Sequence, residues 1–98
     1  MVKRIGALAM VIFLLSFFTS GCFYARAMKE MSAAERSLSD LKAQGGEKLV
    51  PYEYCSAEKL LENAKGEAGE SDWKHARDFA ARSRAASEAG LAQIQKKK

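Results

Sequence analysis

Residues 51–94 read PYEYCSAEKLLENAKGEAGESDWKHARDFAARSRAASEAGLAQI, and this stretch decides the fold. Apolar and small residues recur in it every three or four positions, first over 54–68 and then over 73–94. That spacing places them on one face of a helix, whereas a half-buried strand would show strict alternation. Only residues 69–72 separate the two segments, and so short a connection makes the second helix fold back antiparallel to the first. The stretch therefore predicts an antiparallel helix hairpin.

Residues at the ends of both segments favour the same boundaries. Pro51 suits the first turn of a helix, because its missing N–H would have no intrahelical partner there. Glu53 adds a negative charge where the helix dipole favours one. Gly69 marks the end of this helix, and Ser71 or Asp72 can cap the next one. The expected inward face of the first helix is Tyr54, Ala57, Leu60, Leu61 and Ala64, and that of the second is Trp73, Ala76, Phe79, Ala80, Ser83, Ala86, Ser87, Gly90, Leu91 and Ile94.

A further helix is predicted over residues 27–43, which contain neither Gly nor Pro. Its apolar residues follow spacings of four and three, as in a narrow seam between helices: Ala27, Met31, Ala34, Leu38 and Leu41. Gly45-Gly46 ends it, since glycine adopts the positive φ of a helix C-cap. We expect an all-α fold in which an N-terminal signal or anchor helix comes first, and this helix and the hairpin then form a three-helix bundle. Packing between two copies of the chain is the alternative.

The N-terminal residues have the order of a secretory signal. Lys3 and Arg4 form a short positive region, and an almost unbroken apolar segment follows over 5–18. Small residues then lead to a cysteine in the run Thr19-Ser20-Gly21-Cys22. A positive, an apolar and a small-residue region in this order are typical of a targeting segment. Residues 1–21 are therefore left out of the fold.

The run ending in Cys22 resembles a bacterial lipoprotein signal, in which cleavage before the cysteine exposes a residue that receives diacylglycerol on its sulfur. Gly21 and Ser20 match that pattern, whereas Thr19 stands where leucine is usual. The resemblance implies cleavage between Gly21 and Cys22 and fatty acylation of Cys22, with chains such as palmitate. One acyl chain gives marginal membrane binding, and two or more give stable residence. We therefore expect a lipid-anchored protein.

Two other outcomes for this segment stay open. Residues 5–24 are long and apolar enough for an uncleaved membrane helix, with Lys3 and Arg4 on the cytoplasmic side. Ordinary cleavage would instead release a soluble protein. Each alternative exports the rest of the chain. The residue after the cysteine is Phe23 and not the Asp that resembles an inner-membrane retention signal. An outer-membrane location facing the periplasm is therefore favoured.

The basic isoelectric point of the chain comes from its two ends. The sequence has 16 Lys and Arg against 12 Asp and Glu, a formal net charge of +4. Lys3 and Arg4 belong to the targeting segment, and residues 96–98 form a basic tail. The residues between them carry 11 positive and 12 negative charges, so we expect no nucleic-acid partner. The tail is interpreted as solvated or as touching anionic lipid.

Several short elements occur together over residues 51–86: Pro51-Tyr52-Glu53-Tyr54, Ala57, Leu60-Leu61, Ala64-Lys65, Glu67-Ala68, Asp72-Trp73, Ala76 and Phe79-Ala80. In this order they resemble the bacterial lipoprotein domain catalogued as domain of unknown function 4398, a helical hairpin with the spacing of a tetratricopeptide unit. Members of that family often carry a lipoprotein signal, and related domains are joined to peptidoglycan-binding outer-membrane modules. The resemblance implies an envelope lipoprotein, and it implies no activity.

We find no catalytic constellation in the sequence and expect neither a cofactor nor a metal. His75 is the only histidine, with Asp78 one helical turn away, and this pair is interpreted as solvent-facing. Cys55 has no C-x-x-C partner to make it reactive. We interpret Cys55 as a buried or half-buried thiol, with an intermolecular disulfide as the alternative.

The aromatic residues divide into expected core and expected surface. Trp73 and Phe79 have the spacing of core residues, whereas Tyr52 and Tyr54 are the better candidates for contact with a partner. The chain is thus expected to comprise a signal peptide (1–21), an anchor-proximal helix (22–46), a helical hairpin (47–95) and a basic tail (96–98).

The function expected from these features is that of a non-enzymatic envelope lipoprotein that acts as a periplasm-facing helical scaffold or adaptor. Its expected partners are the membrane, through the lipid anchor, and an envelope or peptidoglycan-associated protein, with self-association as a further alternative. Two other functions stay open. One is a single-pass protein anchored in the inner membrane, and the other is a small membrane-active lipoprotein of the entry-exclusion or lysis type.

Overall fold

The structure, a computed structural model, describes the backbone of residues 2–98 and the side chains of residues 4–15 and 23–98. The described backbone is helical and contains no strand, which confirms the all-α prediction. Its helices are α1 (Val2–Ala43), α2 (Gly46–Leu49), α3 (Pro51–Gly69) and α4 (Trp73–Lys96). The predicted boundaries at Ala43, Pro51 and Gly69 therefore agree with the structure, and the single turn of α2 is an addition.

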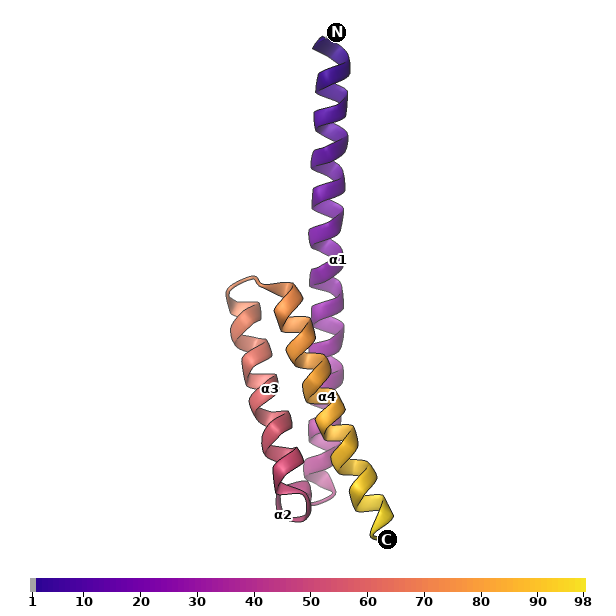
Figure 1. Ribbon diagram of the computed structural model, residues 1–98, viewed down its shortest axis with the longest axis vertical. Helices are drawn as coiled ribbons and strands as arrows, with labels where there is room; N and C mark the ends of the chain where they lie inside the picture. Colours follow the sequence, from indigo (N-terminus) through magenta and orange to yellow (C-terminus); the bar gives the residue numbers. More distant parts are fainter. Residues whose placement is uncertain (1) are drawn as a thin grey trace.

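The helices pack along their lengths (Figure 1). α3 and α4 run in opposite directions beside the C-terminal half of α1, and α4 contacts both of the other long helices extensively. The N-terminal half of α1 continues alone beyond the packed region. This extension gives the molecule its elongated dimensions of 71 × 22 × 15 Å.

Gly45 makes the turn between α1 and α2. Its φ is +80°, in the left-handed region that glycine adopts without strain, as predicted for the end of this helix. Its N–H donates to the carbonyl of Lys42 at 3.0 Å, and its carbonyl accepts from the N–H of Leu49 at 3.0 Å. These bonds use backbone groups that the end of α1 leaves without helical partners. The chain then enters α3 at Pro51, in the first turn where proline was expected.

Most of the core consists of small residues. One cluster contains Ala34, Leu61, Ala64 and Ala80, with Met31, Leu38 and Phe79 packed against it. A second cluster contains Leu41, Val50 and Ile94, with Tyr54 and Leu91 against it. The alanines of the first cluster are fully buried. Because alanine adds only one methyl group beyond the backbone, the helix axes approach closely where these residues meet.

Leu41 is the largest side chain that is fully buried, and two glycines make room for it. A Cβ atom placed on Gly90 would lie 3.0 Å from Cδ1 of Leu41 and 3.2 Å from Cβ of Glu53. A Cβ atom on Gly46 would overlap the Leu41 side chain and lie 2.7 Å from the Leu41 carbonyl oxygen. Glycine at both positions therefore lets α1, α2 and α4 meet around Leu41.

Two buried serines lie on the inward face of α4. Ser83 Oγ donates a hydrogen bond of 2.6 Å to the carbonyl oxygen of Ala57, which links α4 to α3. Ser87 Oγ is also buried and has no hydrogen-bond partner among the described residues. Both side chains are fully enclosed, so each position accepts only a small residue.

Residues 5–15 of α1 are apolar on every side of the helix. The described side chains of residues 4–15 are all exposed, with Ile5 at 68% and Phe13 at 71% of their full accessible surface. Across the described residues, no helix holds an apolar stretch of the length that a membrane crossing requires.

The contrast between Gly90 and Gly66 yields a stability prediction. Both lie within helices, but a Cβ on Gly66 would meet nothing within 4 Å. Gly66→Ala should stabilise the protein by about 0.5–1 kcal/mol through helix propensity alone. Gly90→Ala gains the same propensity but crowds Leu41, and overpacking of this kind costs about 1–3 kcal/mol.

We therefore expect a net loss of about 1 kcal/mol for Gly90→Ala, the crowding cost outweighing the propensity gain. Urea unfolding of the full-length variants in mild detergent, followed by circular dichroism, gives both free energies of unfolding. Equal stabilisation by the two substitutions would show that the packing around Leu41 is looser than described.

Candidate functional site

The predicted lipidation site lies at the beginning of the packed region. The side chain of Cys22 is outside those that the structure describes, as is the predicted cleavage point between Gly21 and Cys22. Both assignments stay predictions. The described side chains resume at Phe23, and Ala27 is the first of them to be fully buried. Cys22 thus precedes the first fully buried side chain of the described part by five residues, about one and a half helical turns.

Aromatic contacts join α1 to α4 directly after Cys22. The rings of Tyr24 and Trp73 meet edge to face, with centroids 4.7 Å apart and an interplanar angle of 85°. The guanidinium carbon of Arg77 lies 5.7 Å from the centroid of the Phe23 ring, within the range of a cation–π contact. Trp73, which was predicted to be core, is half-buried in this contact. Phe79 is half-buried as well and packs against the Ala34 cluster.

A shallow groove lies beside these aromatic residues, between α1 and α4. It is lined by Arg26, Lys29, Glu30, Arg77, Asp78 and Ala81. Glu30 Oε2 is buried and lies 3.5 Å from Nη2 of Arg84, close enough for an ion pair although it makes no hydrogen bond. Asp78 pairs with its neighbour Arg77 at 3.3 Å. The two acidic side chains therefore have basic neighbours, whereas Arg26 and Lys29 are exposed.

The two tyrosines that were predicted to contact a partner are placed differently. Tyr52 is 78% exposed at the start of α3 and has the exposed Leu49 close to it in the chain. Tyr54 is half-buried and packs against the Leu41, Val50 and Ile94 cluster. Desolvation raises the pKa of the Tyr54 hydroxyl, and the nearby carboxylate of Glu58 raises it further. Tyr52 is therefore the better candidate for partner contact, and Tyr54 belongs to the packing.

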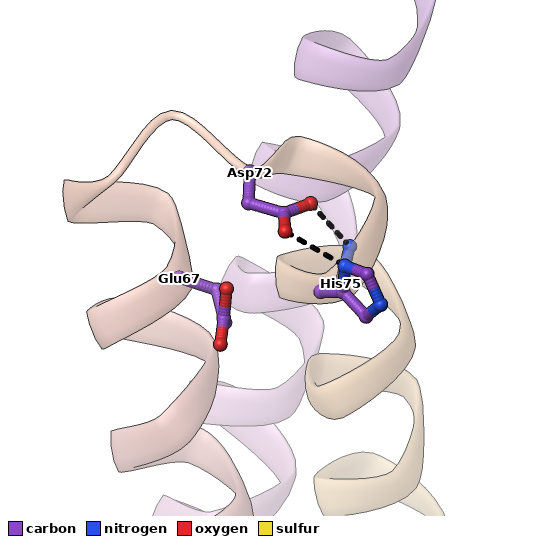
Figure 2. A group of neighbouring side chains, drawn as sticks. All are labelled: Glu67, Asp72 and His75. Atoms are coloured by element: carbon purple, nitrogen blue, oxygen red, sulfur yellow. Dashed lines mark hydrogen bonds and ion pairs between the residues drawn. The ribbon is translucent and has the colours of Figure 1, made fainter.

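Glu67, Asp72 and His75 gather at the connection between α3 and α4 (Figure 2). Asp72 caps α4, since its Oδ1 accepts from the backbone N–H of His75 at 3.2 Å. Its Oδ2 lies 2.7 Å from Nδ1 of the His75 ring. His75 is exposed as expected, and the carboxylate beside it is that of Asp72 and not that of Asp78. At an N-cap, the side chain faces the third residue of its helix, and this geometry brings Asp72 to His75.

The sequence analysis did not bring Glu67 to this cluster. The backbone N–H of Asp72 donates to the Glu67 carbonyl at 2.9 Å, which folds the connection back over the last turn of α3. One ligand atom from each of the three residues lies within 4.8 Å of the others. Imidazole nitrogen and carboxylate oxygen are ligands for divalent metals such as zinc. The bonds between Asp72 and His75 already account for this arrangement as a helix cap.

Cys55 departs from its prediction. Its thiol is free and exposed on α3, so the interpretation as a buried or half-buried thiol was wrong. The inward face of α3 follows Ala57, Leu61 and Ala64, and Cys55 lies two positions before the first of these. Two positions on a helix correspond to about 200° of rotation, so Cys55 points away from the core.

The cap geometry predicts a pH dependence of stability. The pKa of Asp72 is lowered from its ordinary value of 3.8, first by the backbone N–H of His75 and then by the His75 side chain. A carboxyl with a depressed pKa stabilises the folded state above its unfolded-state pKa. This stabilisation is lost as the pH falls through the folded-state pKa.

Wild type should therefore lose thermal stability relative to Asp72→Asn as the pH falls below 3.8, the ordinary carboxyl value. Asparagine keeps the capping ability but does not titrate. The measurement is the difference between the two Tm values from neutral to acidic pH, in which the other carboxyls cancel. Asp72→Ala, which removes the cap, should be less stable than Asp72→Asn throughout. Parallel Tm curves for wild type and Asp72→Asn would contradict the assigned role of Asp72.

Comparison with known proteins found no significant match among family models, curated proteins or solved structures.

Proposed function

We propose that this chain is a non-enzymatic envelope lipoprotein, held by a lipid on Cys22 and favoured at the periplasmic face of the outer membrane. In this proposal its helices act as a scaffold or adaptor that holds a contact surface away from the bilayer. The observation that carries it is the placement of the apolar part of α1. Residues 5–15 expose apolar side chains, and among the described side chains of α1 the first fully buried one, Ala27, comes five residues after Cys22.

The packing of α1 is compatible with cleavage of the chain before Cys22. Among the described side chains of α1, the buried ones run from Ala27 to Leu41. Removal of residues 1–21 would therefore leave these core side chains in place and take away the exposed apolar side chains of residues 5–15. A signal that is cleaved before Cys22 would have this property, because a targeting segment takes no part in the mature fold.

The length of α1 defines the reach of the scaffold. From Cys22 to Ala43 an α-helix rises about 30 Å at 1.5 Å per residue. The turn from α1 into α2 lies at the end of the molecule opposite the N-terminus (Figure 1). Leu49 ends α2 and Tyr52 is the second residue of α3, so both belong to this end. Both are apolar and exposed, which suits a contact with another protein. An envelope protein or a peptidoglycan-associated protein is the proposed partner, and a second copy of this chain is the alternative.

The hairpin and bundle arrangement belongs to this proposal. α4 packs between α1 and α3 through alanine, serine and glycine, so the chain buries its inward faces within one copy. The resemblance of residues 51–86 to domain of unknown function 4398 supports the same envelope setting. A non-enzymatic role is proposed because His75, the one histidine of the sequence, serves the α4 cap through Asp72.

A second candidate is a protein that keeps residues 1–21 as a single-pass anchor in the inner membrane. One observation favours it: α1 is continuous from Val2 to Ala43, without a break at Cys22. The folded helices would then face the periplasm in the same way.

Photocrosslinking tests the proposed contact surface. Benzoylphenylalanine placed at Tyr52 should form one adduct of defined mass in cells, because the side chain would lie against the partner. The same amino acid at Lys65 is the matched control, since Lys65 is also exposed on α3 but lies thirteen residues further on, about 140° around the helix from Tyr52. Adducts of the same kind at both positions, or at neither, would contradict a partner surface at Tyr52.

A further inference from the structure

We propose that the end of the helical domain next to Cys22 is a seat for phospholipid headgroups. This seat, which we call the anchor-proximal surface, consists of Phe23, Tyr24, Arg26, Lys29, Trp73 and Arg77. The inference rests on the proposed anchoring through Cys22. It adds that side chains of the folded part enter the membrane interface and hold the domain upright on the bilayer.

The position of the aromatic pair follows from the anchor. Tyr24 is two residues beyond Cys22, a rise of about 3 Å along α1. The edge-to-face contact with Tyr24 at 4.7 Å brings Trp73 of α4 to the same level. A cysteine bearing diacylglycerol lies at the level of the headgroups, so both rings are held there as well. Trp and Tyr are enriched at membrane interfaces, because their rings are amphipathic.

The exposure of these rings agrees with an interfacial setting. Tyr24 is 48% exposed and Trp73 is half-buried, so each ring presents one edge outward while the other packs. The contact between Arg77 and Phe23, at 5.7 Å, places a guanidinium beside the first described residue after the anchor. An amphipathic pair with a cation beside it combines groups suited to the headgroup layer.

Charge determines which side of this end faces the bilayer. On the α1–α4 side, the exposed Arg26 and Lys29 line the groove, and its acidic residues Glu30 and Asp78 have the arginine neighbours described above. On the α3 side, a second shallow hollow is lined by Glu62, Glu67 and Glu70, together with Asn63, Gly66 and Phe79. Glu62 pairs with Lys59 at 3.9 Å, and the other two glutamates carry the acidic character of this hollow. An anionic bilayer attracts the first side and repels the second. At the end next to Cys22, the α1–α4 side should therefore contact the headgroups while the domain stands upright.

The end of the domain opposite Cys22 lacks this arrangement of aromatic and basic residues among its described side chains, so it serves as a reference for the experiment below. α2 and the C-terminus lie at the end of the packed helices away from the N-terminal half of α1 (Figure 1). Tyr52, the second residue of α3, follows α2 closely in the chain. A separation of about 30 Å exceeds the Debye length of about 8 Å at physiological ionic strength. The basic tail of residues 96–98 therefore does not reach the membrane that holds Cys22 when the domain stands upright.

Trp73 is the only tryptophan in the sequence, which makes it a specific reporter. The full protein, extracted from membranes with its anchor, is reconstituted in vesicles of phosphatidylethanolamine and phosphatidylglycerol, with and without brominated acyl chains. We expect brominated lipid to quench Trp73 emission. The double variant Trp73→Phe, Tyr52→Trp moves the reporter to the far end, where we expect no quenching. Circular dichroism establishes that each variant is folded.

A pair of matched substitutions tests the contribution of charge to the orientation of the domain. Lys29→Glu should reduce the quenching of Trp73 in vesicles that contain phosphatidylglycerol. Lys48→Glu, the same change on the exposed surface of α2 at the far end, should leave it unchanged. Equal effects of the two substitutions would contradict a directed seat on the α1–α4 side.

Flotation of the vesicles separates this inference from the anchoring on which it rests. A protein that floats with the vesicles while Trp73 stays unquenched is anchored without the seat, and the inference is overturned. Equal quenching of the reporters at 73 and 52 also overturns it, since the domain would then lie flat. Failure of the extracted protein to float would overturn the anchoring and the seat together.

Discussion

The close approach of three helices around Leu41 is the constraint on which the rest of the structure depends. Leu41 is fully enclosed because Gly46 and Gly90 present no side chain toward it. From that point toward the N-terminus of α4, small buried residues, mostly alanine and serine, line its inward face. The same packing fixes the axis of α1, which continues past the core to Cys22 and beyond. The direction in which the anchor leaves the domain is therefore set by small residues at its far end.

A core built from small residues is defined by the close fit of its helices more than by the apolar area that it buries. Each alanine buries one methyl group, so the stabilisation per residue is smaller than in a core of leucine or phenylalanine. Polar links supplement it at particular places. Ser83 bonds to the Ala57 carbonyl within the core, and on the surface Gln93 bonds to Glu53 at 2.7 Å, and Lys65 to Glu35 at 3.0 Å. Exposed ion pairs contribute little individually, so the close helix packing carries most of the stability.

The sequence predicted the features of this fold that are local. Helix ends at Gly45, Pro51 and Asp72 follow from backbone geometry and capping, and the inward face of α4 follows from helical period. The features it missed depend on contacts across elements or on rotation about a helix axis. Glu67 reaches Asp72 only because the connection folds back, and Tyr24 meets Trp73 only because α1 and α4 align.

The exposure of Cys55 could have been predicted from its position on the helix, which is away from the inward face of α3. Cysteine is often buried, and the prediction followed that tendency of the residue type. The side chain of Cys22 is outside those that the structure describes, so the proposal of its lipidation rests on the sequence pattern.

The central claim is that the mature chain begins at an acylated Cys22. Intact mass measurement of the membrane-extracted protein, with Cys22→Ala beside it, tests that claim most directly. The account predicts a wild-type mass that lacks residues 1–21 and carries the added mass of acyl chains, and a Cys22→Ala mass without that addition. A full-length, unmodified wild-type mass would contradict it, and would favour a chain that keeps its N-terminal segment as a membrane anchor.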